Sequence, residues 1–154
     1  MKRVDLSVAV TAHNEGIIAH KTILSLFAAV EKLEEKNISY EFLVHIDNGD
    51  KETIDYFKQY EKNKKFRIFQ NHFGDLGSSR NFLSQNADGE CIAFLDADDL
   101  VSANWLITAY ETLKNSKQEA VVHPEAVLNF GLDVPSVLTI QKGSRDKKDD
   151  IAVL

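Results

Sequence analysis

The sequence predicts an α/β fold in which a mainly parallel central sheet carries helices on both of its faces. Short apolar segments rich in β-branched residues alternate with longer segments in which apolar residues recur every three or four positions. The first kind is typical of buried strands and the second of amphipathic helices. Strands and helices that alternate in this way form right-handed βαβ units, and the sheet of such units is parallel.

The first part of the chain predicts two strands and one helix. Residues 4–11 are apolar and rich in valine, which is typical of a buried strand, and the polar residues 12–16 follow as a loop. Residues 17–36 place apolar side chains at the three- and four-residue spacing of a helix face. Residues 40–46 predict the second strand, which ends at the turn-forming residues 47–50.

The same alternation continues through the middle of the chain. Residues 51–62 predict a helix, residues 66–69 a short strand and residues 78–87 a second helix in this region. Residues 91–95 are apolar at every position, so we expect this strand to be central in the sheet. Residues 103–114 again show helical spacing.

The last third of the chain gives weaker patterns. Residues 121–122 and 127–130 favour further strands. Residues 142–150 are charged and contain no apolar anchor, which is typical of a solvated tail.

Composition excludes several classes of protein. With 154 residues, 44% of them hydrophobic, the chain has the size of one globular domain that can bury a core. The net charge of −6 argues against a nucleic-acid polymer or an anionic membrane as the main partner. The single cysteine, Cys91, suits a reducing compartment, and no segment predicts a transmembrane helix. We therefore expect a cytoplasmic protein, at most attached to the inner face of a membrane.

Polar clusters follow three of the predicted strands. They are residues 11–15, residues 47–50 and residues 96–99. In open α/β sheets ligands bind beyond the carboxyl ends of the strands, so these clusters predict a site at one edge of the sheet.

Asp96 and Asp98 are the strongest candidates within these clusters. In an extended segment, residues two apart point to the same face, about 7 Å apart. One carboxylate could then hold a sugar hydroxyl and the other a hard cation such as Mg²⁺ or Mn²⁺. The alternative interpretation is that Asp96 caps the next helix and that the other acids face solvent.

Other polar residues allow structural interpretations when taken alone. Asp47 could be a turn former or a helix cap, and His13 a structural loop residue. Arg80 stands at the start of a predicted helix, where a cation is unfavourable, and this indicates a partner such as a carboxylate or a base edge. His45, in the middle of a strand, is expected to be a packed core histidine.

Five short segments can be compared with known sequence motifs: residues 10–15 (VTAHNE), 41–53 (EFLVHIDNGDKET), 77–81 (GSSRN), 87–90 (ADGE) and 94–99 (FLDADD). Together they resemble the motifs of the GT-A-fold family 2 glycosyltransferases and follow one another in the same order, across about residues 4 to 110. The motif D-x-D by itself is common, so the resemblance depends on all five segments and their order.

The resemblance implies a Rossmann-like GT-A fold with a nucleotide-sugar donor site. The donor is expected to be a nucleotide-diphosphate sugar, with a UDP-sugar favoured, and the cofactor Mn²⁺ or Mg²⁺. In such a site Asp98 would ligate the metal that bridges the diphosphate, and Asp96 would contact the ribose. The remaining implied contacts are with the nucleoside: Thr11, His13, Asp47 and Arg80.

The sequence departs from the family pattern at two positions near the base. His13 replaces the usual tyrosine, which keeps a flat ring, and Ile46 replaces the first of two acids. The resemblance implies in-line attack by an acceptor hydroxyl, with inversion and a carboxylate base. Glu125 and Asp133 are candidates for that base only by elimination, so the catalytic residue stays unknown.

The resemblance also implies a division of the chain. Residues 1–100 would be the donor-binding half, residues 101–141 the start of an acceptor-side region, and residues 142–154 a charged, flexible tail. The chain is expected to be part of a longer enzyme of cell-envelope polysaccharide biosynthesis, acting on a glycan or lipid-linked acceptor.

Two other functions stay open on the sequence. One is a non-catalytic nucleotide-sugar-binding module. The other is a haloacid-dehalogenase-type phosphatase, because residues 96–100 nearly match its nucleophile motif.

Overall fold

The computed structural model describes residues 4–124, 126–130 and 135–139. The chain divides into two compact units, Met1–Ile107 and Thr108–Leu154. The helix α4 (Trp105–Asn115) runs across the boundary between them. Among the described residues, no helix is both long enough and apolar enough to cross a membrane.

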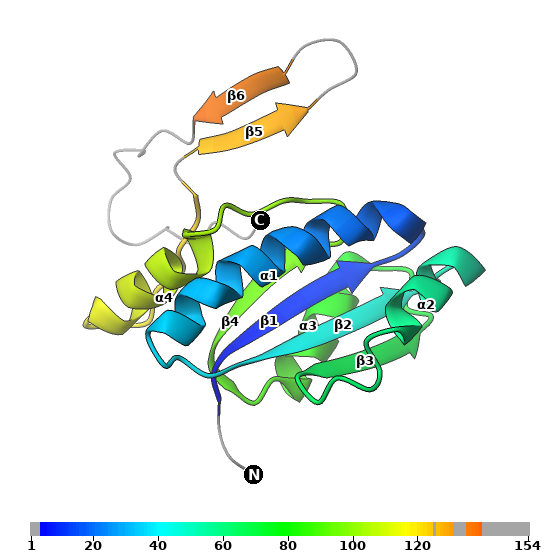
Figure 1. Ribbon diagram of the computed structural model, residues 1–154, viewed down its shortest axis with the longest axis horizontal. Coiled ribbons are helices and arrows are strands. Elements are labelled where there is room, and N and C mark those ends of the chain that lie inside the picture. Colours follow the sequence, from blue (N-terminus) through cyan, green and yellow to red (C-terminus); the bar gives the residue numbers. More distant parts are fainter. Residues whose placement is uncertain (1–3, 125, 131–134, 140–154) are drawn as a thin grey trace. The chain divides into compact units, whose positions relative to one another are not determined.

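The first unit is built on one parallel sheet with the strand order β3-β2-β1-β4 (Figure 1). Its elements, in chain order, are β1 (Val4–Ala12), the short 3₁₀ helix η1 (Gly16–Ile18), α1 (Ala19–Glu35), β2 (Tyr40–Asp47), α2 (Lys51–Lys58), β3 (Phe66–Asn71), α3 (Leu76–Asn86) and β4 (Gly89–Asp96).

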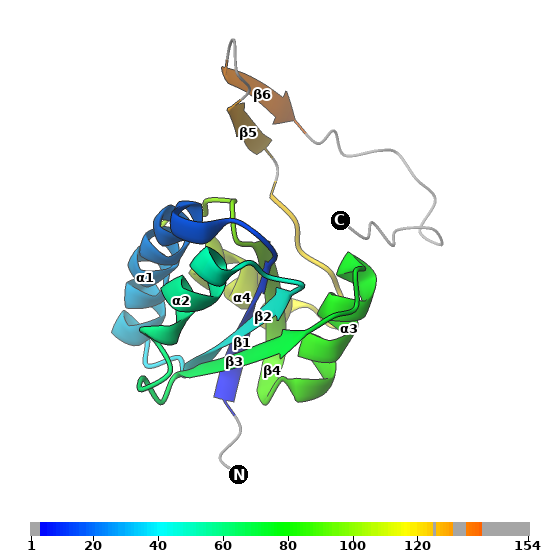
Figure 2. The same ribbon diagram turned by 90° about the vertical axis from the view of Figure 1, so that its right-hand side faces the viewer.

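Helices cover both faces of this sheet. Figure 2 shows α1 and α2 on one side of the strands and α3 on the other. The predicted α/β architecture, a parallel sheet between two helical layers, is therefore confirmed.

Alternate residues of a strand pack against the helices on opposite faces of the sheet. Phe42 of β2 packs against Phe27 of α1, with ring centroids 6.0 Å apart. Leu43, the next residue along, belongs instead to a buried cluster with Ala9 of β1 and Leu83 of α3. Because side chains alternate along a strand, β1 and β2 are buried on both faces and form the centre of the sheet.

The expectation that residues 91–95 form a central strand is wrong for the described part of the chain. There β4 pairs with β1 alone and lies at the end of the sheet. Most of its residues are only partly buried, and Phe94 is 39% exposed. An apolar composition shows that a strand is suited to burial, but it does not specify which neighbours cover it.

Several predicted element boundaries differ from the structure by one or more residues, and that of α2 differs most. α2 ends at Lys58, and the chain continues in turns, in which the Tyr60 amide donates to the Phe57 carbonyl. β3 extends to Asn71, beyond the predicted residues 66–69, because its parallel pairing with β2 continues to Asp47.

The second unit contains an antiparallel hairpin of β5 (Ala126–Phe130) and β6 (Pro135–Thr139). The strand predicted at residues 127–130 is confirmed, whereas β6 was not predicted. The strand predicted at residues 121–122 is wrong, since this segment has no regular structure and Val121 is 69% exposed. The charged segment 142–150 lies outside the described residues.

Candidate functional site

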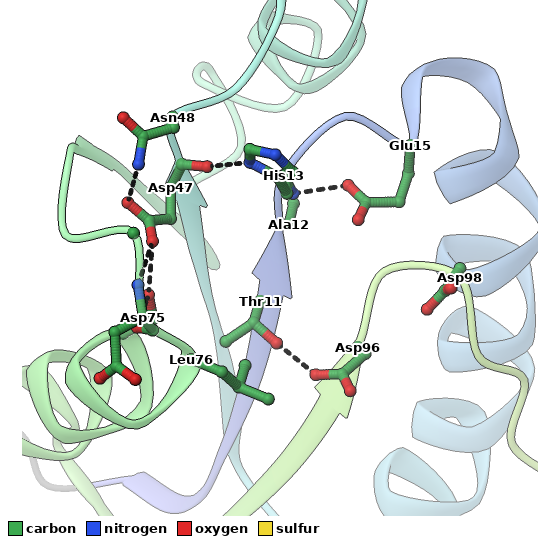
Figure 3. Close-up of a pocket in the computed structure, with 12 residues that line it drawn as sticks. Thr11, Ala12, His13, Glu15, Asp47, Asn48, Asp75, Leu76, Asp96 and Asp98 are labelled. Carbon is green, nitrogen blue, oxygen red and sulfur yellow. Dashed lines mark hydrogen bonds between the residues drawn. The ribbon is translucent and has the colours of Figure 1, made fainter.

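A cavity of about 400 Å³ opens at the carboxyl edge of the sheet in the first unit. The loops that follow β1, β2 and β4 contribute to its lining, together with the start of α3 (Figure 3). Five of the six side chains singled out from the sequence line it: Thr11, His13, Asp47, Asp96 and Asp98.

The strand order explains why these side chains meet. β2 and β4 flank β1 on opposite sides. The strands β2 and β3 are therefore added on one side of β1, and β4 is added on the other. The pairing register places Asp96 opposite Thr11 and Ile46 opposite Ala12, which aligns the ends of three strands. In open α/β sheets, ligands bind at the point where the strand order changes sides in this way.

Arg80, the sixth predicted residue, does not line the cavity but binds Asp96, which does. Its Nη2 atom donates to both carboxylate oxygens of Asp96, at 3.1 Å and 3.3 Å. The hydroxyl group of Thr11 also donates to Asp96. The carboxylate partner expected for Arg80 is thus Asp96, and the orientation of Asp96 is fixed by side chains from β1 and α3.

The expected extended geometry of Asp96 and Asp98 is wrong, because the strand ends between them. Ala97 is fully buried, and its amide still donates to the Thr11 carbonyl at 2.9 Å. The Asp99 amide then donates back to the Asp96 carbonyl at 3.1 Å, which closes a turn. Asp98 sits on this turn, and its side chain still borders the same cavity as Asp96.

The acids around this turn are close enough to influence one another. Desolvation of the Asp99 carboxyl group and the negative charges of Asp98 and Asp96 raise the pKa of Asp99. Such crowding of carboxylates disfavours further negative charge, and a bound cation would relieve it.

Asp47 uses its carboxylate to organise the loop between β3 and α3. Its Oδ1 atom accepts a hydrogen bond from the Phe73 amide at 2.6 Å, and its Oδ2 atom accepts one from the Asp75 amide at 3.2 Å. Desolvation acts to raise the pKa of Asp47, but the backbone donors of residues 73–75 outweigh it and lower the pKa below its usual value. Asp47 is therefore neither a turn former nor the cap of α2, which is Asp50.

His13 joins the ends of β1 and β2. Its Nδ1 atom lies 2.5 Å from the Asp47 carbonyl oxygen, and its Nε2 atom lies 3.0 Å from Nδ2 of Asn14. The His13 amide donates to the Glu15 carboxylate at 2.6 Å.

Sequence reasoning missed several residues of the site. Seven residues line the cavity without having been assigned an individual role there: Ala12, Glu15, Asn48, Gly74, Asp75, Leu76 and Ser79. Asp75 caps α3 by accepting from the Ser78 amide, and an acid three residues before a serine at a predicted helix start is a signal that could have identified it.

His45 is a core residue, as predicted. It is fully buried, its ring stacks on Phe73 at 5.2 Å, and its Nε2 atom bonds Oδ1 of Asn71 at 3.0 Å. Burial lowers the pKa of His45 and outweighs the opposing effects of Asn71 and Asp47.

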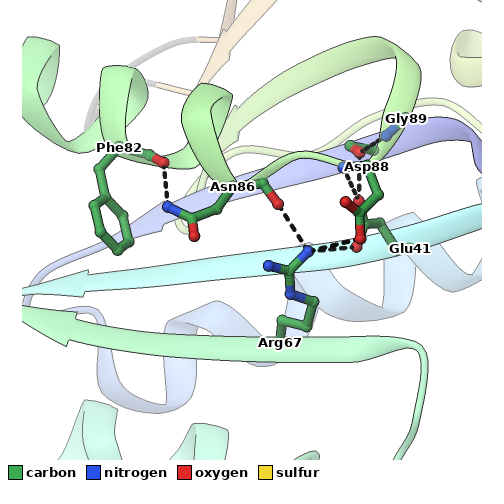
Figure 4. A network of polar contacts seen from close by, with 7 residues as sticks. Glu41, Arg67, Phe82, Asn86, Asp88 and Gly89 are labelled. Carbon is green, nitrogen blue, oxygen red and sulfur yellow. Dashed lines mark hydrogen bonds and ion pairs between the residues drawn. The ribbon is translucent and has the colours of Figure 1, made fainter. Parts of the chain in front are cut away.

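A partly buried polar network at the amino ends of the strands sets the register of β4 (Figure 4). Glu41 accepts hydrogen bonds from the Ser7 hydroxyl and the Asp88 amide, each at 2.7 Å. Arg67 bridges the carboxylates of Glu41 and Asp88, at 3.2 Å from each. The Gly89 amide donates to the Ser7 hydroxyl at 2.9 Å, so β4 begins at a fixed position and its last residue falls beside Thr11.

Comparison with known proteins identifies relatives of this chain. The family model described as glycosyl transferase family 2 matches residues 7–132. The poly(ribitol-phosphate) beta-N-acetylglucosaminyltransferase TarP of Staphylococcus aureus (strain N315) is 28% identical over 153 residues, which cover 98% of this chain and 45% of TarP. The minor teichoic acid biosynthesis protein GgaB of Bacillus subtilis (strain 168) is 37% identical over 86 residues, which cover 51% of this chain and 9% of GgaB. The chain spans less than half of the length of either relative.

Solved structures of S. aureus TarS share the fold. The structure of TarS 1–349 in complex with UDP-GlcNAc matches with a TM-score of 0.62 at 20% identity, covering 79% of this chain and 38% of that chain. The structure in complex with UDP matches with a TM-score of 0.61 at the same identity, covering 79% of this chain and 39% of that chain. The predicted GT-A-type fold is thus confirmed.

Proposed function

The chain belongs to glycosyl transferase family 2, and from this membership we propose that its first unit is the donor site of an enzyme that transfers a sugar from a nucleotide-diphosphate sugar to an acceptor hydroxyl. The observation that carries this proposal is the cavity at the carboxyl edge of the sheet. Its volume of about 400 Å³ lies in the range of small-molecule sites. Family membership decides against the phosphatase alternative.

We propose that Mn²⁺ or Mg²⁺ assists this reaction. Within the described residues no group of three His, Cys, Asp or Glu side chains is placed to hold a metal. The Asp98 carboxylate is exposed and has no hydrogen-bonding or ionic partner among these residues, so its oxygens are available to a hard cation. The donor diphosphate and water would supply the other oxygen ligands, and the bound metal would offset the charge of the leaving group.

The residues of the chain itself bind and orient the donor in this proposal. Asp96, held by Thr11 and Arg80, presents carboxylate oxygens that can accept hydrogen bonds from the ribose hydroxyls. His13 and Asp47 form the wall next to the base. Attack by the acceptor hydroxyl in line with the leaving group would invert the anomeric centre. Both candidates for the base, Glu125 and Asp133, lie outside the described residues.

We further propose UDP-GlcNAc as the donor and a polyol-phosphate polymer of the teichoic acid type as the acceptor. The relatives support both choices. TarS has been solved with UDP and with UDP-GlcNAc, and TarP is named for N-acetylglucosamine transfer to poly(ribitol phosphate). Such an acceptor would place the enzyme in the synthesis of the cell envelope.

Calorimetric titration tests the donor site. UDP, GDP and dTDP are titrated into the full chain with and without Mn²⁺, and into the variants Asp98→Ala and Glu61→Gln. Glu61 lies in an exposed turn away from the cavity and serves as the charge-matched control. We expect UDP to bind best, Mn²⁺ to strengthen binding, and Asp98→Ala to weaken Mn²⁺-dependent binding at least about tenfold, or about 1.4 kcal/mol.

Two results would contradict the proposal. One is an affinity of the native chain for UDP that does not change when Mn²⁺ is added. The other is an Asp98→Ala variant in which the Mn²⁺-dependent affinity is the same as in the native chain. Hydrolysis of UDP-GlcNAc or transfer of its sugar would separate an enzyme from a module that only binds the nucleotide sugar.

A further inference from the structure

Hydrogen bonds connect the ends of β1 and β2 in a closed chain. The Asp50 amide donates to Oδ1 of Asn14 at 2.7 Å. Nδ2 of Asn14 lies 3.0 Å from Nε2 of His13, and Nδ1 of His13 lies 2.5 Å from the carbonyl oxygen of Asp47. The last group of this chain belongs to the final residue of β2, and the first belongs to the residue that caps α2, three positions later.

Both ends of this hydrogen-bond chain have a fixed direction. A backbone amide can only donate, so Asn14 must turn its carbonyl oxygen toward Asp50 and its NH₂ group toward His13. That NH₂ group can only donate, so Nε2 of His13 must be the unprotonated nitrogen. The proton then resides on Nδ1, where the Asp47 carbonyl, which can only accept, receives it. All donors and acceptors match for one tautomer of His13 and for no other.

We infer that Asn14 is a positioning residue: together with the Asp47 carbonyl it holds the imidazole of His13 as the neutral Nδ1–H tautomer. The inference rests on the proposed function, in which His13 borders the nucleobase. Because both ring nitrogens are engaged in hydrogen bonds, neither is available to ligate a metal or to accept a proton. The ring offers the nucleobase a flat apolar surface.

The nearby carboxylates are occupied by other partners. Glu15 accepts from the backbone amide of His13, and Asp47 accepts from the Phe73 and Asp75 amides. Asp50 accepts from the Thr53 amide. Among the described residues none of these carboxylates hydrogen-bonds to the imidazole, although the charge of Asp50 interacts with His13 through space.

Nitrogen NMR of the full chain tests the tautomer directly. Long-range ¹H–¹⁵N correlations distinguish the two neutral tautomers from the imidazolium, and loss of one signal set in His13→Gln assigns it. We expect the Nδ1–H pattern at neutral pH, whereas a solvated histidine side chain favours the Nε2–H form. An Nε2–H pattern in the native chain would overturn the inference, and this measurement needs no folded variant of Asn14.

The variant Asn14→Asp tests the role of Asn14. A carboxylate still accepts from the Asp50 amide but cannot donate to Nε2, so Nε2 must acquire a proton. We expect the Nδ1–H pattern of His13 to give way in this variant to a form that carries a proton on Nε2. Asn63→Asp adds the same charge in an exposed turn and preserves the acceptor for the Lys65 amide, so it should leave His13 unchanged. An unchanged His13 spectrum in Asn14→Asp contradicts the inference.

Binding measurements separate this inference from the proposed function. Asn14→Ala should weaken the binding of uridine and of UDP by the same factor, about fivefold. The lost contact is the one between His13 and the base, which both compounds contain. A loss confined to UDP would instead place Asn14 at the diphosphate and refute the positioning role. If the native chain binds neither compound, the proposed function fails, while the tautomer of His13 still decides whether the hydrogen-bond chain exists.

Discussion

The guanidinium group of Arg80 on α3 lies 3.1 Å from the carboxylate of Asp96 at the end of β4. Both side chains are partly shielded from solvent, with 22% of Arg80 and 36% of Asp96 exposed. Because Thr11 donates to the same carboxylate, three elements of the first unit determine where Asp96 points. A catalytic site benefits from such support, since each degree of freedom removed beforehand is not lost on binding.

A double-mutant cycle should measure this relationship. We expect Arg80→Leu and Asp96→Asn to couple by about 0.5–1 kcal/mol in the free energy of unfolding, as for other partly exposed pairs. The more exposed pair of Lys51 and Asp55 on α2 is the control, and its coupling should be smaller. Chemical denaturation of the four proteins of each cycle gives both values. Independent, additive effects of the two substitutions would contradict the arrangement described for Arg80 and Asp96.

Asp47 should contribute to stability in a pH-dependent way. Its pKa is lowered in the folded chain, so its stabilising effect is present above the unfolded value of about 3.9 and is lost as the pH falls through the folded value. Asp47→Asn should cost about 1 kcal/mol at neutral pH and should flatten the fall of the unfolding free energy as the pH drops below about 4. The Phe73 amide proton, which donates to Asp47, gives an independent NMR titration. Equal slopes for the native chain and the variant would refute the prediction.

Gly89 should not tolerate a side chain. A Cβ atom there would lie 2.4 Å from the backbone nitrogen of Ser7 and 2.6 Å from its hydroxyl oxygen. We expect Gly89→Ala to destabilise the chain by about 2–3 kcal/mol, because backbone atoms would have to move. Gly77→Ala is the matched control: its Cβ atom would meet only the Asp75 side chain, at 3.3 Å, so stability should change by less than about 1 kcal/mol. Thermal and urea unfolding compare the two, and equal effects would contradict the close approach of β4 to β1.

Removing the charge of Glu41 should weaken the start of β4. In Glu41→Gln, an oxygen kept toward the Ser7 hydroxyl and the Asp88 amide forces the new NH₂ group against Arg67, which is also a donor. We expect a loss of about 2–3 kcal/mol, typical of a broken buried network. Glu31→Gln, on the exposed face of α1, should change stability by less than about 0.5 kcal/mol. A similarly small effect at Glu41 would show that the network is dispensable.

The first unit could be predicted from the sequence because its patterns are local. Valine-rich β1 and the regularly spaced apolar residues of α1 each specify their own structure, and their alternation specifies a parallel sheet. The position of β4 in that sheet could not be predicted, since an apolar strand is compatible with any location that buries it. β6 gave no usable pattern, because its five residues begin with a proline and are too few for alternation to stand out.

The same distinction applies to the site. The order of the strands indicated that Thr11, Asp47 and Asp96 would gather at one edge, and the structure places them there. It did not indicate that Asp98 would sit on a turn or that Asp47 would hold the loop after β3. Those features depend on contacts between segments far apart in the chain, which no local pattern encodes.

The attachment of the Phe73–Asp75 backbone to Asp47 has a consequence for how this protein can change over evolution. Asp47 binds the backbone amides of this loop, so the attachment does not depend on which side chains the loop carries. Replacements at its surface positions could therefore change which ligands the cavity accepts, while the path of the main chain is retained. Selectivity and architecture would then be inherited separately, and relatives with few identical residues could share one scaffold.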